Sequence, residues 1–278
     1  MKNSYQRVLT VQDISCVGQC SLTVALPILS ACGIETCILP TALLSNHTAK
    51  GFHGFTCLDL TKELPAIFSQ WKKEGILFDA IYTGYLGSVP QIGLLLEALP
   101  SLLKENAPLI VDPAMADYGA LYPAFDQSYV EEMKKLCARA DYLLPNLTEA
   151  CLLADVPYRE GMGEGEIEGL IEKLSERYFA TVVLKGIPLG DELGILAVKG
   201  GKKLASYRHR RLPQNLHGTG DIFASAFSGA LIKTGDLSRS IRTAADFTVK
   251  SMENTLSDPS HWYGAKFETA LSELTQKF

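Results

Sequence analysis

The sequence has no long hydrophobic run and no strong excess of charge of one sign. The nearest candidate for a membrane span, residues 21–44, is interrupted by Pro27, Glu35 and Pro40, and a span needs about 18 or more apolar residues. Among the 278 residues, 26 are basic and 31 acidic, which gives a net charge of -5. We therefore expect neither a membrane span nor broad binding to nucleic acid.

Paired cysteine spacing and a secretory signal are also missing. The seven cysteines are scattered, and Cys16 and Cys20 have no second Cys or Cys/His pair at zinc-like spacing. Residues 1–7 are polar and lead directly into a strand-like run, unlike a secretory leader. These features predict reduced thiols and a cytoplasmic location.

Short apolar runs of strand length alternate with longer segments of helical period. The sequence predicts strands at 7–11, 35–40, 78–83, 108–112, 142–145 and 181–185, with helices between them at 18–31, 60–73, 90–106, 128–139 and 164–178. This alternation predicts an α/β fold with a central, mostly parallel sheet flanked by helices on both faces.

The last third of the sequence follows a different pattern. Strands at 194–199 and 204–209 are expected to form an antiparallel hairpin that closes the sheet, and helices are expected at 220–233, 238–253 and 265–275. No linker rich in proline or serine divides the chain, so residues 1–278 are predicted to form a single domain. The weakly periodic segment 41–58 is predicted to form a short flap over a site.

Several familiar catalytic motifs are absent: Walker A, the dinucleotide fingerprint, H-E-x-x-H and G-x-S-x-G. Phosphate binding would therefore rest on Gly218, Thr219, Gly220 and Asp221, at the start of helix 220–233. Two glycines let backbone N–H groups converge, and the helix N-terminus adds positive charge. Asp221 could then accept the proton of a hydroxyl that attacks a phosphoryl group. A simple turn followed by an acidic first helical turn explains the motif equally well.

Other polar residues follow the predicted strands, where ligands bind in open parallel sheets. Asp112 could hold Mg²⁺ through water or form a turn. Asn146 and Glu149 have the spacing of a capping box, which is compatible with metal or phosphate binding. Lys185 could bring an ammonium group to nucleotide phosphates or lie at the surface.

Taken together, these motifs resemble the ribokinase superfamily and, within it, the pyridoxal (vitamin B6) kinases. The resemblance covers essentially the whole chain. Residues 218–221 resemble the anion hole and catalytic base of the superfamily, and Asn146-x-x-Glu149 resembles its N-x-x-E element. Residues 45–48 and 83–85 are similar to stretches that line the pyridine pocket, and 111–117 resembles the D-P-V-x-G-D segment.

The resemblance implies transfer of the γ-phosphoryl group of ATP to the 5′-hydroxyl of pyridoxal, pyridoxine or pyridoxamine. It implies that Asp221 is the catalytic base and that Asp117 belongs to the nucleotide loop. The ATP phosphates would meet Gly218, Thr219, Gly220, Asn146 and Lys185, and Mg²⁺ would be held by Asp112 and Glu149, through water.

The same resemblance implies a set of substrate-binding residues and a homodimer. Tyr85 and His47 would pack on or beside the ring, and the remaining substrate-binding residues would be Asp13, Ser15 and Thr48. A monovalent cation such as K⁺ is common in the superfamily, and homodimers are usual in this branch. The expected partners are thus ATP, a B6 vitamer and a second copy of the chain.

The sequence also departs from the pyridoxal kinases. Gln12-Asp13-Ile14-Ser15 replaces their common Gln-Ser-His, and Cys20-Ser21 replaces a glycine–asparagine pair. Residues 12–15 and 216–220 also resemble hydroxymethylpyrimidine kinases, which often have Cys in place of Asp221. A hydroxymethylpyrimidine kinase and a non-catalytic vitamer-binding relative therefore remain alternatives, whereas the short segment 41–58 disfavours a sugar or nucleoside kinase.

Overall fold

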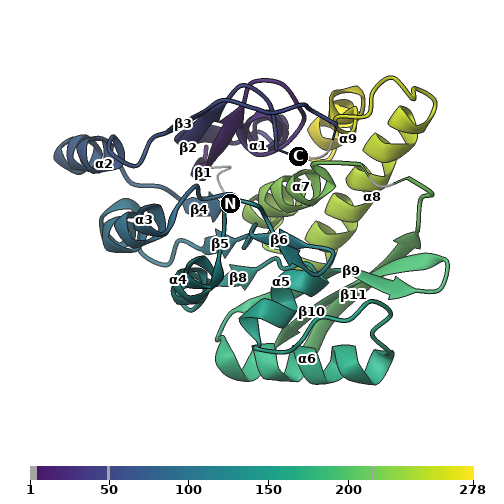
Figure 1. Ribbon diagram of the computed structural model, residues 1–278. Coiled ribbons are helices and arrows are strands. Elements are labelled where there is room, and N and C mark those ends of the chain that lie inside the picture. Colours follow the sequence, from purple (N-terminus) through teal and green to yellow (C-terminus); the bar gives the residue numbers. More distant parts are fainter. Residues whose placement is uncertain (1–4, 49–50, 215) are drawn as a thin grey trace.

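The computed structural model describes residues 5–48, 51–214 and 216–278. Within these ranges, a nine-stranded sheet in the order β11-β10-β9-β8-β5-β4-β1-β2-β3 runs through the middle of the molecule (Figure 1). Its strands are β1 Arg7–Ser15, β2 Glu35–Leu44, β3 Cys57–Asp59, β4 Ala80–Thr83, β5 Leu109–Val111, β8 Tyr142–Leu143, β9 Thr181–Leu189, β10 Glu192–Lys199 and β11 Lys202–Arg210.

Helices cover both faces of the sheet. One face packs against α1 Leu22–Ala31, α7 Thr219–Thr234, α8 Leu237–Leu256, the 3₁₀ turn η1 Phe267–Ala270 and α9 Leu271–Thr275. The other face packs against α2 Leu64–Lys73, α3 Val89–Leu102, α4 Gln127–Cys137, α5 Leu147–Leu153 and α6 Glu164–Arg177. The predicted α/β class is confirmed. No helix in the described part of the chain is both long and apolar enough to cross a membrane.

The central strands are apolar on both sides because both sides are covered. In β1, Leu9 and Val11 contact one helical layer, and Val8 contacts the other. In β4, Ile81 and Tyr82 divide in the same way. Such alternation explains the near-continuous apolar runs of the sequence, which are typical of buried parallel strands.

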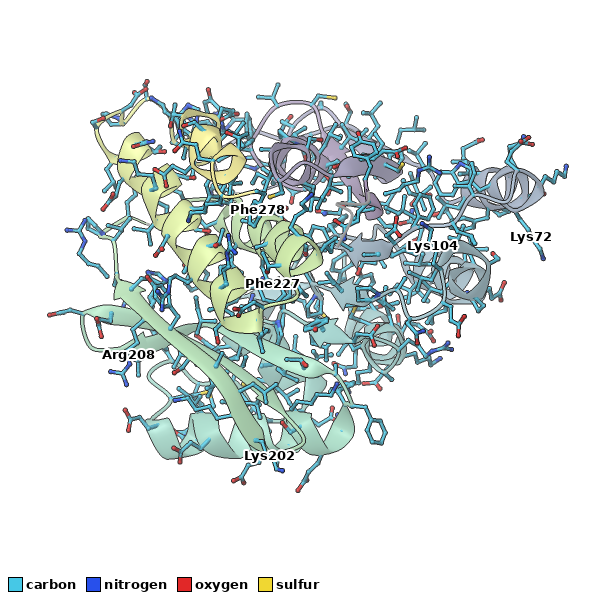
Figure 2. The ribbon with its side chains drawn as sticks, turned by 180° about the vertical axis from the view of Figure 1, so that it is seen from behind. Lys72, Lys104, Lys202, Arg208, Phe227 and Phe278 are labelled. Atoms are coloured by element: carbon cyan, nitrogen blue, oxygen red, sulfur yellow. The ribbon has the colours of Figure 1, made fainter. Side chains whose placement is uncertain are left out.

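The antiparallel closure of the sheet is also confirmed. β9 pairs with β10, and β10 with β11, in antiparallel register. Figure 2 shows this hairpin from behind, with Arg208 and Lys202 labelled along its edge strand and Phe227 on α7 above it. β9 runs on to Leu189, beyond its predicted end, because its second half pairs with the start of β10.

Several elements differ from their predicted form. The sequence did not predict β3 or the small hairpin of β6 Ala116–Asp117 and β7 Ala120–Leu121, and it marked helix α5 only by the capping box at its start. The predicted flap 41–58 begins inside β2 and ends inside β3, which pair at the edge of the sheet. All three β3 residues are exposed, so no apolar alternation marked the strand. Residues 49–50 of that segment lie outside the described residues.

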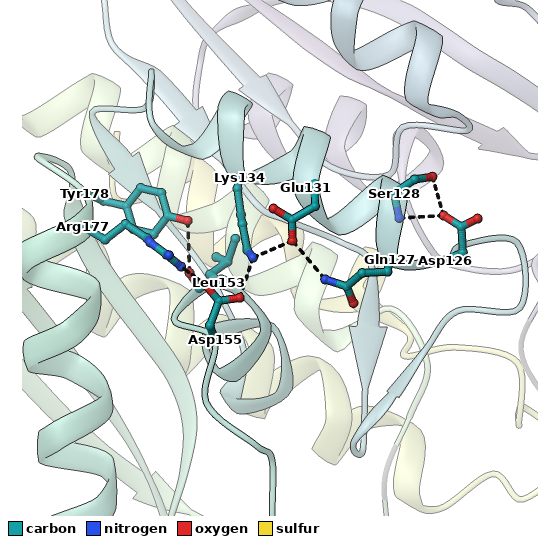
Figure 3. A network of polar contacts seen from close by, with 9 residues as sticks. All are labelled: Asp126, Gln127, Ser128, Glu131, Lys134, Leu153, Asp155, Arg177 and Tyr178. Atoms are coloured by element: carbon teal, nitrogen blue, oxygen red, sulfur yellow. Dashed lines mark hydrogen bonds and ion pairs between the residues drawn. The ribbon is translucent and has the colours of Figure 1, made fainter.

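A surface network of ion pairs connects α4 with the ends of α5 and α6 (Figure 3). The Nζ of Lys134 lies 2.8 Å from a Glu131 oxygen and 2.6 Å from an Asp155 oxygen. The other Asp155 oxygen is 2.7 Å from Arg177 Nη1, and the Tyr178 hydroxyl donates to the Leu153 carbonyl. These contacts hold together three helices on the face opposite α7.

Candidate active site

The sheet reverses its direction of winding between β1 and β4. From β1 the chain adds β2 and β3 on one side and then returns to add β4 and β5 on the other. Ligands of open α/β sheets bind at such a switch point, beyond the carboxyl ends of the strands. The residues at this point are Gln12 and Asp13 of β1 and Gly84 and Tyr85 after β4.

The turn before α7 can only be built with glycine. Gly218 is the N-cap of the helix with φ 75, in the left-handed region that favours glycine. A Cβ at this position would lie 1.8 Å from the backbone oxygen of Gln19. The turn is therefore packed directly against the loop after β1. The first N–H groups of a helix have no partner within the helix, so they can bind an anion here.

Asp221 lies in the first turn of α7, next to this anion-binding turn. Burial and the nearby Asp112 raise the pKa of Asp221 to about 7, although the backbone N–H of Ser21 opposes the shift. A general base works best when its pKa is close to the operating pH. Asp221 therefore has the titration expected of a residue that accepts a hydroxyl proton near neutrality.

Lys185 lies beside the same turn. Its Nζ is 2.8 Å from Asp112 Oδ2, and the two side chains are only 13% and 5% exposed. The same Nζ lies 3.7 Å from the position that a Cβ on Gly220 would take. Although burial favours the neutral amine, the carboxyls of Asp112 and Glu149 raise the pKa of Lys185. A buried ammonium thus lies next to the anion-binding turn.

Asn146 and Glu149 form the capping box of α5. The Asn146 side chain accepts from the Glu149 N–H at 2.9 Å, and Glu149 Oε2 accepts from the Asn146 N–H at 2.9 Å. Glu149 Oε1 also accepts from the Met115 N–H at 3.3 Å. The capping role is confirmed, and the same bonds fix segment 113–117 over the site.

Asp117 lies in β6, above the buried charges. It is exposed, and its carboxyl interacts electrostatically with Lys185 and His217. Asn146 Nδ2 donates to the carbonyl of Ala116 at 2.8 Å. The capping residue of α5 therefore holds the hairpin that carries Asp117 near the anion-binding turn.

The predicted substrate residues divide into two groups. Asp13 and Ser15 are buried, and Ser15 Oγ donates to Asp13 Oδ2 at 3.0 Å. Burial and the nearby Asp13 carboxyl raise the pKa of Tyr85 to about 12, so Tyr85 lies near Asp13. Because Asp13 also interacts with Asp221, these residues share one site.

His47 and Thr48 occupy the neighbouring loop. The His47 ring contacts Phe52 and His217, with ring centroids 4.9 and 5.2 Å away, and its Nε2 is 3.0 Å from the Tyr263 carbonyl. His47 therefore connects this loop to the turn that precedes Gly218. Thr48 is exposed.

A family model described as phosphomethylpyrimidine kinase matches residues 27–264. The chain belongs to the phosphomethylpyrimidine kinase family. It is accordingly a small-molecule kinase.

This family member is similar to three known proteins over nearly its whole length. A Bacteroides thetaiotaomicron protein assigned as a phosphomethylpyrimidine kinase is 35% identical with a TM-score of 0.92, over 99% of this chain and 95% of that chain. Its crystal form with pyridoxal is 34% identical with a TM-score of 0.90, over 98% and 96%. Pyridoxal kinase from Lactobacillus plantarum is 31% identical with a TM-score of 0.91, over 99% and 98%. A pyridoxal kinase of Burkholderia orbicola is 26% identical, over 95% of this chain and 98% of its own.

Kinases of this family use ATP together with a divalent metal, and the buried acids fit such an ion. Burial and Asp112 raise the pKa of Glu149, and burial raises that of Asp112, with Lys185 opposing both shifts. Two buried carboxyls facing one lysine leave negative charge that a hard cation would balance. In the described residues, no three His, Cys, Asp or Glu side chains gather to hold a metal alone, so phosphate and water oxygens would complete its shell.

Two residues near these charges were not predicted from the sequence as site residues. Burial and the nearby Asp221 and Asp13 carboxyls raise the pKa of the Cys20 thiol, so Cys20 lies near both carboxyls. Burial and Glu149 raise the pKa of Tyr122, and Asp221 also contributes. Cys20 stands at the glycine–asparagine departure noted in the sequence, whereas no motif marks Tyr122.

Proposed function

We propose that this chain transfers the γ-phosphoryl group of ATP to the 5′-hydroxyl of a vitamin B6 vitamer. The observation that carries the proposal is Asp221, a carboxyl with a pKa of about 7 in the first turn of α7, behind the Gly218 turn. Lys185, paired with Asp112, lies beside that turn. This arrangement combines a base with binding groups for phosphate in one place.

In the proposed reaction, the 5′-oxygen of the vitamer attacks the γ-phosphorus while its proton passes to Asp221. The bond between the γ-phosphorus and the bridging oxygen breaks, and ADP leaves. The backbone N–H groups of residues 218–220 and the ammonium of Lys185 would stabilise the charge on the transferred group. Because little covalent chemistry is left to the protein, positioning and electrostatics account for most of the acceleration.

Asp112 and Glu149 would hold the metal, which we propose to be Mg²⁺. When bound, Mg²⁺ neutralises charge on the ATP phosphates. Asp117 would face the nucleotide. A requirement for K⁺, a homodimeric assembly, a single-domain organisation and a cytoplasmic location remain predictions that rest on the sequence.

For the acceptor ring, we propose contact with Tyr85 and with the Asp13–Ser15 pair. A buried carboxyl at Asp13 suits a ring that carries a hydrogen-bond donor, such as a protonated pyridine nitrogen. The pyridoxal in the crystal form of the Bacteroides thetaiotaomicron protein supports a pyridine substrate. His47 and Thr48 would close the pocket from the loop beside it.

A second candidate is hydroxymethylpyrimidine kinase. The matching family model bears that activity in its description, and the aminopyrimidine ring also offers hydrogen-bond donors to Asp13. Asp221 in place of the cysteine common in that branch favours the B6 vitamer. The fold, the anion-binding turn and the base would serve either substrate.

The decisive experiment is ATP consumption by the purified protein with Mg²⁺. Pyridoxal, pyridoxine, pyridoxamine and hydroxymethylpyrimidine are compared side by side, each also with Asp221→Asn. We expect turnover on a B6 vitamer that the variant loses. Turnover only on hydroxymethylpyrimidine would replace the substrate, and tight vitamer binding without any turnover would support a binding protein instead.

A further inference from the structure

Tyr85 lies in segment 84–88, the loop that joins β4 to α3. The loop begins at the switch point between β1 and β4, because the Gly84 N–H donates to the Val11 carbonyl of β1 at 3.1 Å. Tyr85 is only half-buried, so part of the residue is accessible to a bound ring. Loops of this kind are mobile unless other groups hold them, and here several groups do.

Two buried side chains from other elements bind carbonyls of this loop. Thr41 of β2 donates from Oγ1 to the Tyr85 carbonyl at 3.1 Å, and the Tyr129 hydroxyl of α4 donates to the Leu86 carbonyl at 2.7 Å. Tyr129 also supports the Tyr85 ring, because Phe125 stacks on Tyr129 with ring centroids 3.6 Å apart and lies 5.1 Å from Tyr85. The backbone and the ring of Tyr85 are therefore both held in place.

Gln91, in the first turn of α3, binds the same loop at a further point and is only 1% exposed. Its Oε1 accepts from the Gly87 N–H at 2.7 Å, and its Nε2 donates to the Thr41 carbonyl at 2.9 Å. The same Nε2 lies 2.9 Å from Thr61 Oγ1 and 3.2 Å from Asp59 Oδ2. An amide supplies donors and an acceptor from the end of one side chain. One buried group thus connects the loop to β2, to β3 and to the segment after β3.

We propose that Gln91 is a positioning residue for Tyr85, which it holds beside the acceptor ring together with Thr41 and Tyr129. The inference rests on the proposed function, in which Tyr85 contacts that ring. Burying polar groups without hydrogen bonds costs stability, and these groups keep their partners only while the loop holds this conformation. A loop already ordered before binding gives a higher affinity, because no ordering entropy is lost when the ring arrives. The network therefore pre-organises the acceptor side of the site, whereas the Gly218 turn serves the phosphate side.

The test is Gln91→Met, which keeps the length of the side chain and removes its hydrogen bonds. We expect KM for the vitamer to rise about fivefold, with kcat and KM for ATP unchanged, because the lost contacts order the binding site for the ring alone. The matched control is Gln6→Met. Gln6 Nε2 donates to the Ile232 carbonyl at 2.9 Å, at the opposite, amino-terminal end of β1. A general loss of stability would appear in both variants, whereas only Gln91→Met should change KM for the vitamer.

Thr41→Val and Tyr129→Phe each remove one hydroxyl from the loop and keep the shape of the side chain. We expect each to raise KM for the vitamer about threefold, so they carry the test even if Gln91→Met does not fold. In a Tyr85→Ala background we expect Gln91→Met to cause no further rise, because it acts through Tyr85. Wild-type KM in all three single variants, or an equal rise in Gln6→Met, would overturn the proposal.

The wild-type protein in the same assay tests the proposed function separately. If it phosphorylates a vitamer and the variants match it, only the positioning role is wrong. If it accepts only hydroxymethylpyrimidine, the proposed vitamer is wrong, and a rise in KM for that ring in Gln91→Met would still support the positioning role. If it phosphorylates neither ring, the proposed function and the positioning role both fail.

Discussion

The ion pairs around Lys134 and around Lys185 use the same chemical groups in opposite surroundings. Lys134 binds Glu131 and Asp155 at the surface (Figure 3), where these acids are about half exposed. Hydrogen bonds from Lys134 lower the pKa of both acids. Lys185 binds Asp112 in the interior, where burial raises the pKa of the acid despite the lysine.

The difference lies in the balance of charge. At the surface, two cations, Lys134 and Arg177, serve two acids, and water screens what remains. In the interior, one lysine interacts with three acids, Asp112, Glu149 and Asp221. The surface network is complete as it stands, whereas the interior group is short of positive charge. Such a shortage costs stability, and a bound cation would relieve it.

The largest test of this comparison is Asp221→Asn. A general base contributes about 10²–10⁴-fold, so we expect kcat to fall by about 10³-fold. At pH 8 we also expect a higher Tm. The raised folded pKa means that the stability contribution of Asp221 is present below its unfolded pKa and is lost as pH rises through about 7. Thermal melting and steady-state kinetics at pH 8 check both effects. A lower Tm would contradict the inference that the buried acids lack enough positive charge.

Gly218→Ala should have the next largest effect. The added Cβ would meet the Gln19 carbonyl at 1.8 Å in a left-handed turn, so we expect a loss of about 2 kcal/mol or more in unfolding free energy. Gly235→Ala is the control, because Gly235 has φ 65 at the other end of α7 with no atom near its Cβ position. Urea unfolding of both variants separates the steric clash with Gln19, which only Gly218→Ala introduces, from the strain of a left-handed backbone, which both variants introduce. Equal losses would show that the contact with Gln19 is unimportant.

The pH dependence of kcat/KM is a smaller effect. As the proposed base, Asp221 would have to be ionised to accept a proton, and its pKa is about 7. Activity should therefore fall about tenfold per pH unit well below pH 7 and level off above it. A pH–rate profile of the wild-type protein tests this expectation. A midpoint near 4 would mean that Asp221 behaves like the surface acids.

The smallest effect is expected for Asp155→Asn. Asp155 has φ 54, which asparagine tolerates as well as aspartate, so the change removes the charge and one of the two acceptor oxygens without straining the backbone. We expect a loss of about 0.5 kcal/mol at low salt and an unchanged kcat. Because hydrogen bonds lower the pKa of Asp155, this stability is present above its unfolded pKa and is lost as pH falls through the folded pKa. Urea titrations at pH 7 and pH 3 check the sign.

Much of the fold follows from local pattern. All eight predicted strands are present. The central ones follow apolar runs because strands buried on both faces must be apolar throughout, whereas the strands at 194–199 and 204–209 follow from the glycine turn between them; β11 itself has no buried residue. The helix predicted at 18–31 begins only at Leu22, since residues 16–21 form the loop that contacts the Gly218 turn. β3 was not predicted, because its residues are exposed and its pairing depends on a distant strand, β2.

Part of the site could also be predicted from local sequence pattern. Asp13, Asp112 and Lys185 follow apolar runs, and Gly218 to Asp221 form a local motif, so topology alone brings them to one edge. Tyr122 gave no signal, because a lone tyrosine in a connecting segment is an ordinary residue. Its proximity to Glu149 and Asp221 depends on how segments distant in the sequence pack together, which no local pattern specifies.

The contact between Gly218 and the Gln19 carbonyl has a consequence for engineering. The backbone N–H of Ser21, in the same loop, also lowers the pKa of Asp221, so loop 16–21 and turn 217–221 act on each other at both ends. Grafting either segment alone from a relative would misfit the other. A designer who wishes to exchange the acceptor substrate must transplant both segments together, although about two hundred residues separate them in the chain.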